Sequence, residues 1–76
     1  MIIKVLGSGC AKCQKLEKNV LKAIQESGLN AQVVKVTDLQ AIMKYGVIST
    51  PALVVDEAVK STGRILSPSD IIKLIS

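Results

Sequence analysis

Apolar and polar positions divide the chain into short blocks, and the spacing within each block predicts one element. The first block, residues 2–6, is aliphatic except for Lys4, and residues 7–9 bring it to an end. A short apolar run bounded by glycine is typical of a buried strand followed by a loop. The chain is therefore expected to begin with a strand that leads into a loop at Gly7.

The second block predicts an amphipathic helix. Its apolar positions recur at helical spacing, and charged or amide side chains occupy the other faces. The apolar residues are Leu16, Val20, Ala23 and Ile24. Cys13 falls on the same stripe, and Gly28 supplies a left-handed cap at the carboxyl end. We therefore expect a helix with Cys13 on its buried face.

The middle of the chain predicts a second strand and a second helix. Three β-branched valines lie within residues 33–36, which favours a strand. Thr37 and Asp38 follow, and they are expected to cap a helix that continues through Ile42 to Gly46. The second helix is thus expected to be short.

The last third predicts a hairpin and a final helix. Residues 52–55 and 58–61 flank the polar pair at 56–57, as in two antiparallel strands joined by a tight turn. Ser67 then stands at a helix N-cap position, with Pro68 at the first helical position. The chain is expected to end in this helix.

The predicted order is β-α-β-α-β-β-α, which indicates one α/β domain over residues 1–76 with three helices and a central four-stranded mixed sheet. Two successive strand-helix-strand units predict parallel pairing, with right-handed crossovers that place the helices against the sheet. Of the 76 residues, 49% are hydrophobic, but Tyr45 is the sole aromatic residue. The core is therefore expected to be aliphatic.

Charge and hydropathy exclude several classes of function. The formal charge of +4 comes from lysines spread along the chain, and without aromatic platforms this pattern does not favour nucleic-acid binding. No apolar run approaches the roughly 20 residues that span a bilayer. We therefore expect a cytoplasmic, monomeric protein that binds neither nucleic acid nor membrane. Thiols in that compartment are mostly kept reduced.

The two cysteines, Cys10 and Cys13, have C-x-x-C spacing at the expected start of the first helix. Amide hydrogens at a helix N-terminus favour a thiolate, and Lys12 adds positive charge, so we expect a lowered pKa for Cys10. One helical turn brings Cys13 beneath it. Cys10 would then attack a protein disulfide, and Cys13 would resolve the mixed disulfide.

Two other interpretations of the pair stay open. Two thiolates suit a soft metal such as Cu(I) or Zn(II), but with no histidine in the chain they make only half of a tetrahedral zinc site. A metal carrier would need ligands from a partner or a second copy. Alternatively, Cys13 is a small core residue and Cys10 a chance surface thiol.

Two family resemblances bear on this choice. The stretch "IIKVLGSGCAKCQKLEKNVLKAI" looks like the first half of copper-chaperone domains, but the order of later elements differs from theirs. The segment "KYGVISTPALVV", together with "GCAKC", resembles the thioredoxin superfamily, and in particular its small, glutaredoxin-like redox-active disulfide proteins. This second resemblance covers nearly the whole chain and implies the minimal thioredoxin fold.

The thioredoxin resemblance implies roles for particular residues. Cys10 would be the nucleophile and Cys13 the resolving thiol of a thiol-disulfide oxidoreductase. The Thr50–Pro51 bond would be cis and face the cysteines, with the Thr50 backbone pairing to a substrate segment; an ordinary trans proline that opens a strand is the alternative. The acid that assists proton transfer in thioredoxins has no counterpart on the first strand, where only Lys4 is ionisable, so we expect water to take the proton of Cys13.

The same resemblance implies partners. These are protein disulfides as substrates and a thioredoxin-reductase-like electron donor, with no cofactor or metal beyond the redox-active Cys10–Cys13 disulfide.

Overall fold

The helices and strands follow the predicted order in a computed structural model that describes residues 1–7 and 11–75. Expectations for Ser8, Gly9 and Cys10 lie outside the described residues. The elements are β1 (Ile2–Leu6), α1 (Ala11–Ser27), β2 (Gln32–Val36), α2 (Leu39–Lys44), β3 (Ala52–Val55), β4 (Ala58–Thr62) and α3 (Pro68–Ile75).

The strands form a mixed four-stranded sheet in the order β2-β1-β3-β4. The first strand-helix-strand unit is parallel as predicted, since β1 pairs with β2 in parallel. The expectation for the second unit is wrong, because β3 is separated from β2 by β1 and pairs with β1 in the antiparallel sense. Local sequence pattern does not define this pairing, since it depends on which strand becomes the neighbour of β3 in the sheet. Because the pairing is antiparallel, β3 starts at the end where β1 stops, with Ala52 opposite Leu6.

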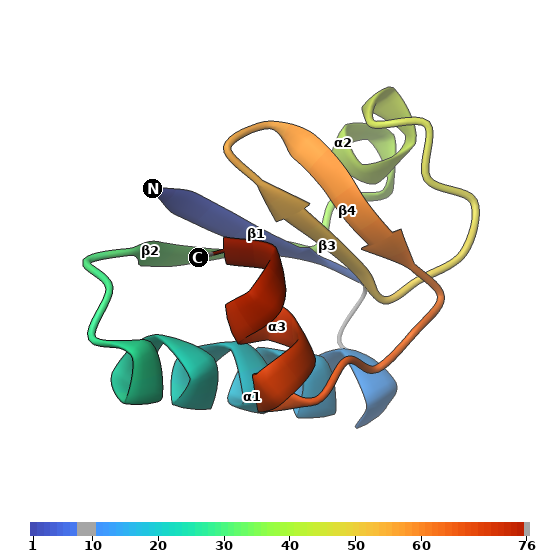
Figure 1. Cartoon of the computed structure of the whole chain (residues 1–76). Helices are drawn as coiled ribbons and strands as arrows, with labels where there is room; N and C mark the ends of the chain where they lie inside the picture. Colours follow the sequence, from blue (N-terminus) through green and yellow to red (C-terminus); the bar gives the residue numbers. More distant parts are fainter. Residues whose placement is uncertain (8–10, 76) are drawn as a thin grey trace.

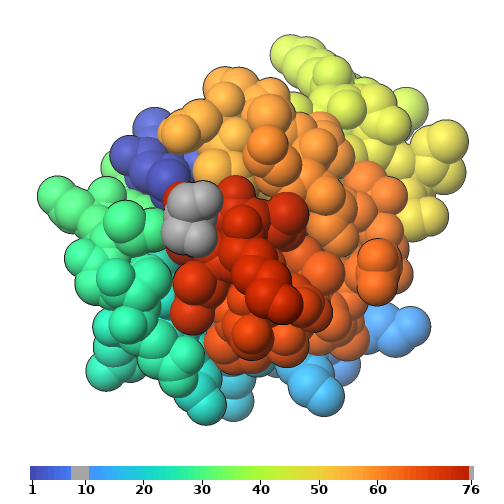
Figure 2. All heavy atoms as spheres, in the orientation of Figure 1, coloured from blue at the N-terminus to red at the C-terminus, as the bar shows by residue number. Residues whose placement is uncertain are grey.

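Helices cover both faces of this sheet. Figure 1 shows α1 and α3 together on one side, with α2 on the other. Side chains alternate along β1, so Ile3 and Val5 pack in the larger core with α1 and α3, whereas Leu6 packs in a smaller core with Ile42 of α2. Both cores are aliphatic, as the composition predicts. In the space-filling view, the side chains of α3 and β4 form much of the face toward the reader (Figure 2).

Local contacts explain how several elements begin and end. Gly28 follows α1 with a φ of 71°, as the predicted left-handed cap requires. Ser67 caps α3 by accepting a hydrogen bond from the Asp70 amide at 3.2 Å. Asp38 holds the N-cap position of α2, but its side chain makes no capping hydrogen bond, so that part of the prediction is wrong.

The predicted hairpin is present, and its turn is tight. Asp56 and Glu57 both adopt positive φ angles, 48° and 68°, the backbone form of a two-residue turn that usually contains asparagine or glycine. The Asp56 carboxylate accepts a hydrogen bond from the Ile2 amide at 2.9 Å. This contact fastens the turn to the start of β1. Over the described residues, no helix has the length and apolar character needed to cross a bilayer.

Candidate functional site

Cys13 lies in the first turn of α1 with only 6% of its surface exposed. It lies on the buried helical stripe that also carries Leu16 and Val20, as the sequence predicts. Its sulfur packs against Gly7, the residue that follows β1. A Cβ atom on Gly7 would collide with Cys13 Sγ and would lie 3.1 Å from Cys13 Cβ. Glycine is therefore required at position 7 to make room for this thiol.

Pro51 lies near the same point. The Cβ position of Gly7 is 4.0 Å from the Pro51 Cα, so both Cys13 and Pro51 lie close to Gly7. The Thr50–Pro51 bond is cis, as the resemblance implies. Pro51 is buried, and its carbonyl accepts a hydrogen bond from the Gly63 amide at 2.8 Å, while Thr50 is exposed. The cis bond therefore joins a buried proline to an exposed residue beside the thiol.

A cavity of about 60 Å³ opens next to Cys13. Its wall includes Val5 at the end of β1, Glu17 on α1 and Lys35 on β2. The carboxylate of Glu17 and the ammonium of Lys35 form an ion pair, with Oε2 and Nζ 2.9 Å apart. The cavity thus places a thiol, a carboxylate and an ammonium group in one small space.

The predicted site residues are only partly brought together by the described structure. Cys13 and Pro51 meet at Gly7, with Thr50 directly before the proline. Cys10 lies outside the described residues, so its role and its lowered pKa stay predictions. Lys12 is exposed on α1.

Sequence reasoning missed the contact that Gly7 makes and the pair Glu17–Lys35. One signal was present: Glu17 lies four residues after Cys13, a spacing that puts two side chains on the same helix face. Lys35 had no comparable signal, because its position depends on the pairing of β2 with β1.

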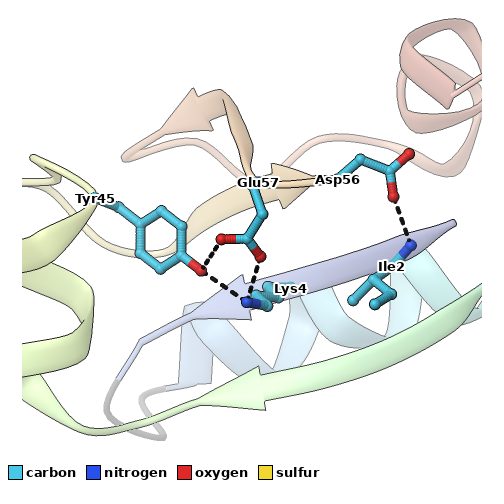
Figure 3. Close-up of polar contacts among 5 residues, drawn as sticks. All are labelled: Ile2, Lys4, Tyr45, Asp56 and Glu57. Carbon is cyan, nitrogen blue, oxygen red and sulfur yellow. Dashed lines mark hydrogen bonds and ion pairs between the residues drawn. The ribbon is translucent and has the colours of Figure 1, made fainter.

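A second polar cluster lies on the opposite face of the sheet and consists of Lys4, Tyr45 and Glu57 (Figure 3). Lys4 Nζ donates hydrogen bonds to Tyr45 Oη at 2.7 Å and to Glu57 Oε1 at 2.5 Å. The Tyr45 hydroxyl in turn donates to Glu57 Oε2 at 3.0 Å. Side chains alternate along β1, so Lys4 points away from the larger core, in which Ile3 and Val5 pack. The cluster joins β1, the end of α2 and the hairpin turn.

The same contacts shift the pKa values of Glu57 and Lys4. The hydrogen bond from Lys4, and then that from Tyr45, lowers the pKa of Glu57 below its ordinary value of 4.5. The hydrogen bonds to Glu57 and then to Tyr45 raise the pKa of Lys4 above 10.5. Both charged forms are therefore favoured in the folded protein.

Over residues 1–7 and 11–75, no three histidine, cysteine, aspartate or glutamate side chains form a group that could hold a metal ion. The soft-metal interpretation rests on Cys10 as well as Cys13, so it stays a hypothesis from the sequence.

Comparison with known proteins assigns this arrangement to a family. The family model described as "Thioredoxin domain" matches residues 1–76. A thioredoxin of Methanothermobacter thermautotrophicus is 40% identical over 76 residues, which are 100% of this chain and 99% of that protein. A thioredoxin of Methanocaldococcus jannaschii is 38% identical over 71 residues, covering 93% of this chain and 81% of that protein.

Two solved structures have the same fold at low sequence identity. One is described as thioredoxin-2, a component of malaria parasite protein secretion machinery; it has a TM-score of 0.75 and 20% identity, with 97% of this chain and 79% of that chain covered. The other, a malarial protein, has a TM-score of 0.72 and 21% identity, with 97% and 91% covered.

Proposed function

The chain belongs to the thioredoxin domain family of thiol-disulfide oxidoreductases, and from this premise we propose that it reduces disulfide bonds in other proteins through Cys10 and Cys13. The observation that carries the proposal is the packing of Cys13: a buried thiol in the first turn of α1, beside Gly7 and the cis bond at Pro51. A thiol in that position is protected from solvent oxidants, and in the sequence it follows by three residues the cysteine that would hold a mixed disulfide.

In the proposed reaction, the Cys10 thiolate attacks one sulfur of a substrate disulfide. A Cys10–substrate disulfide forms, and the other substrate sulfur leaves as a thiolate. The Cys13 thiolate then attacks Cys10 Sγ, which forms the Cys10–Cys13 disulfide and releases the second substrate thiolate. Two electrons pass from the cysteine pair to the substrate, and a thioredoxin-reductase-like donor restores the dithiol.

The exposed residue Thr50 supports a role in substrate binding. It directly precedes the buried Pro51, next to the site where the thiol packs. We assign its backbone to pairing with an extended segment of the substrate, in the manner of an added strand. The reducing environment of the cytoplasm suits a pair that must return to the dithiol form.

Substrate trapping tests this proposal. The Cys10→Ser variant is expected to lose dithiothreitol-dependent insulin reduction entirely. The Cys13→Ser variant is expected to keep the first attack and to accumulate a mixed disulfide, visible as a mass increase that dithiothreitol removes. Ser69→Ala, a change at an exposed position of α3, is the matched control and should behave as the wild type.

A redox titration supplies an independent check. Thioredoxin, glutaredoxins and disulfide isomerase have potentials between about −270 and −180 mV. If the wild-type pair forms no intramolecular disulfide in buffers spanning that range, and insulin reduction matches that of Cys10→Ser, the oxidoreductase proposal fails.

A further inference from the structure

The cavity beside Cys13 is lined by the ion pair Glu17–Lys35, which has no role in the proposed reaction as described so far. Glu17 lies one turn after Cys13 on α1, so both side chains project from the same face of the helix. Lys35 reaches the cavity from the neighbouring strand, because it is paired with Val5 in the parallel register of β1 and β2. Paired residues of a sheet share a face, and Val5 packs in the core beneath α1.

The exposure of the two partners is unequal. The Glu17 side chain is 23% exposed, while that of Lys35 is 60% exposed. An ion pair with one partner this open to solvent contributes little to folding stability. Its position is nevertheless specific, since both partners line the cavity beside Cys13, one from α1 and the other from β2. This arrangement fits a role in chemistry better than a role in holding α1 to the sheet.

The second step of the proposed reaction needs a proton acceptor at this place. A thiol is a poor nucleophile until it loses its proton, and a buried thiol ionises less readily than an exposed one. Among the described residues that line the cavity, Glu17 and Lys35 are the charged groups, and those of β1 are uncharged. At about 60 Å³, the cavity is also large enough to hold a water molecule.

We propose that Glu17 accepts the proton of Cys13 during resolution of the mixed disulfide, directly or through a water in the cavity. In this proposal, Lys35 keeps the Glu17 carboxylate ionised. The Cys13 S–H bond breaks, and its electron pair forms the new bond to Cys10 Sγ. The substrate sulfur leaves with the electrons of the old disulfide bond, and the proton on Glu17 then passes to that thiolate or to solvent. This inference rests on the proposed function, and it replaces our expectation that water alone takes the proton.

A stopped-flow reaction with 5,5′-dithiobis(2-nitrobenzoate) separates the two steps. With equimolar probe, attack by Cys10 releases a first coloured thiolate at a rate that depends on probe concentration. Attack by Cys13 releases the second coloured thiolate at a rate that is independent of probe concentration. We expect Glu17→Gln to leave the first phase unchanged and to slow the second about tenfold or more at pH 7, within the range usual for general-base catalysis. The two proteins should converge near pH 9, where hydroxide ionises the thiol.

Two controls distinguish proton transfer from a structural effect. Glu26→Gln removes an exposed acid from the same helix and should keep both phases. Lys35→Gln leaves the carboxylate without its cation, so the pH at which the second phase reaches half its maximum should rise. Lys35→Arg should restore the wild-type profile.

The outcomes are distinct. A second phase in Glu17→Gln within twofold of the wild type overturns the role of Glu17 and leaves the proposed function standing. If Glu17→Gln does not fold, an unchanged pH profile in Lys35→Gln overturns it instead. A wild-type protein that releases only one thiolate per chain overturns the proposed function, and the inference with it.

Discussion

Gly7 and Cys13 occupy adjoining space so closely that position 7 has no room for a Cβ atom. That atom would collide with Cys13 Sγ, and it would stand 3.1 Å from Cys13 Cβ. The loop that leaves β1 and the helix that carries the thiol are therefore packed against each other at one residue. The sulfur can occupy its position only because Gly7, the residue that follows β1, has no side chain.

The first prediction concerns this packing. Gly7→Ala is expected to lower the free energy of unfolding by about 1–3 kcal/mol, the usual cost of an added methyl group in a packed core. It should also slow release of the second thiolate, because the sulfur must move. Urea denaturation and the two-phase thiol assay measure the two effects.

Two comparisons isolate the collision. Gly28→Ala meets no atom within 4 Å and carries only the strain of a φ of 71°, about 1 kcal/mol, so the second phase should keep its wild-type rate. In a Cys13→Ala background, Gly7→Ala should cost less, since the sulfur is gone. Equal costs in both backgrounds would contradict the packing explanation.

The second prediction concerns pH. The pKa of Glu57 is lowered, so its contribution to stability is present above its ordinary value of 4.5 and is lost as the pH falls through the folded value. The pKa of Lys4 is raised, so its contribution is present below 10.5 and is lost as the pH rises through the folded value. Glu57→Gln is therefore expected to show a smaller loss of stability than the wild type on acidification below pH 4.5.

Urea midpoints at pH 6, 4.5 and 3 test this expectation. The matched control, Glu26→Gln, removes an exposed acid of α1 outside the cluster and should retain the wild-type slope. Because the groups are at the surface, 1 M salt should reduce the difference between wild type and Glu57→Gln. Parallel acid profiles at low salt would argue against a contribution from the cluster.

The third prediction concerns the start of α3. Ser67 accepts a hydrogen bond from the Asp70 amide, so Ser67→Ala should cost about 1 kcal/mol of unfolding free energy. Ser67→Asp keeps an acceptor and should cost much less. Ser69→Ala, two residues further along and exposed, is the control. Thermal unfolding of the three variants decides the matter; equal midpoints for Ser67→Ala and Ser69→Ala would show that the cap contributes nothing.

The fourth prediction concerns the hairpin turn. Asp56→Ala removes the acceptor for the Ile2 amide and places alanine at a positive φ, so we expect a loss of about 1–3 kcal/mol from the two effects. Asp56→Asn keeps an acceptor and tolerates that backbone, and should stay within about 0.5 kcal/mol of the wild type. Urea denaturation of the pair measures the difference, and an Asp56→Ala protein as stable as Asp56→Asn would contradict it.

Much of the fold could be predicted because each element has its own local pattern. The stripe from Leu16 to Ala23 and the cap at Gly28 predict α1 without reference to the rest of the chain. The direction of β3 could not be predicted in this way, because it depends on its pairing with β1, a strand far away in the sequence. Local pattern also predicted the N-cap at Ser67, which the structure has. It predicted a side-chain cap at Asp38 as well, and that hydrogen bond does not form.

The candidate site shows the same division. C-x-x-C spacing and the "STPALVV" segment marked Cys13 and Pro51 from the sequence alone, and the structure brings both to Gly7. The approach of Lys35 to Glu17 depends on the register that sets Lys35 opposite Val5, a relation between residues far apart in the chain. Such a contact has no local signature, and the pair was found only once the sheet was known.

The order of strands has one more consequence, for the behaviour of the chain among copies of itself. The sheet ends on β2 at one side and β4 at the other, and each edge carries an exposed lysine, Lys35 or Lys60. An unpaired edge strand can form hydrogen bonds with a strand of another chain. Such pairing would bury the ammonium group of the edge lysine, which is unfavourable. Lys35, the ion-pair partner of Glu17, therefore also disfavours edge-to-edge aggregation of the sheet, and this effect matters most at high protein concentration.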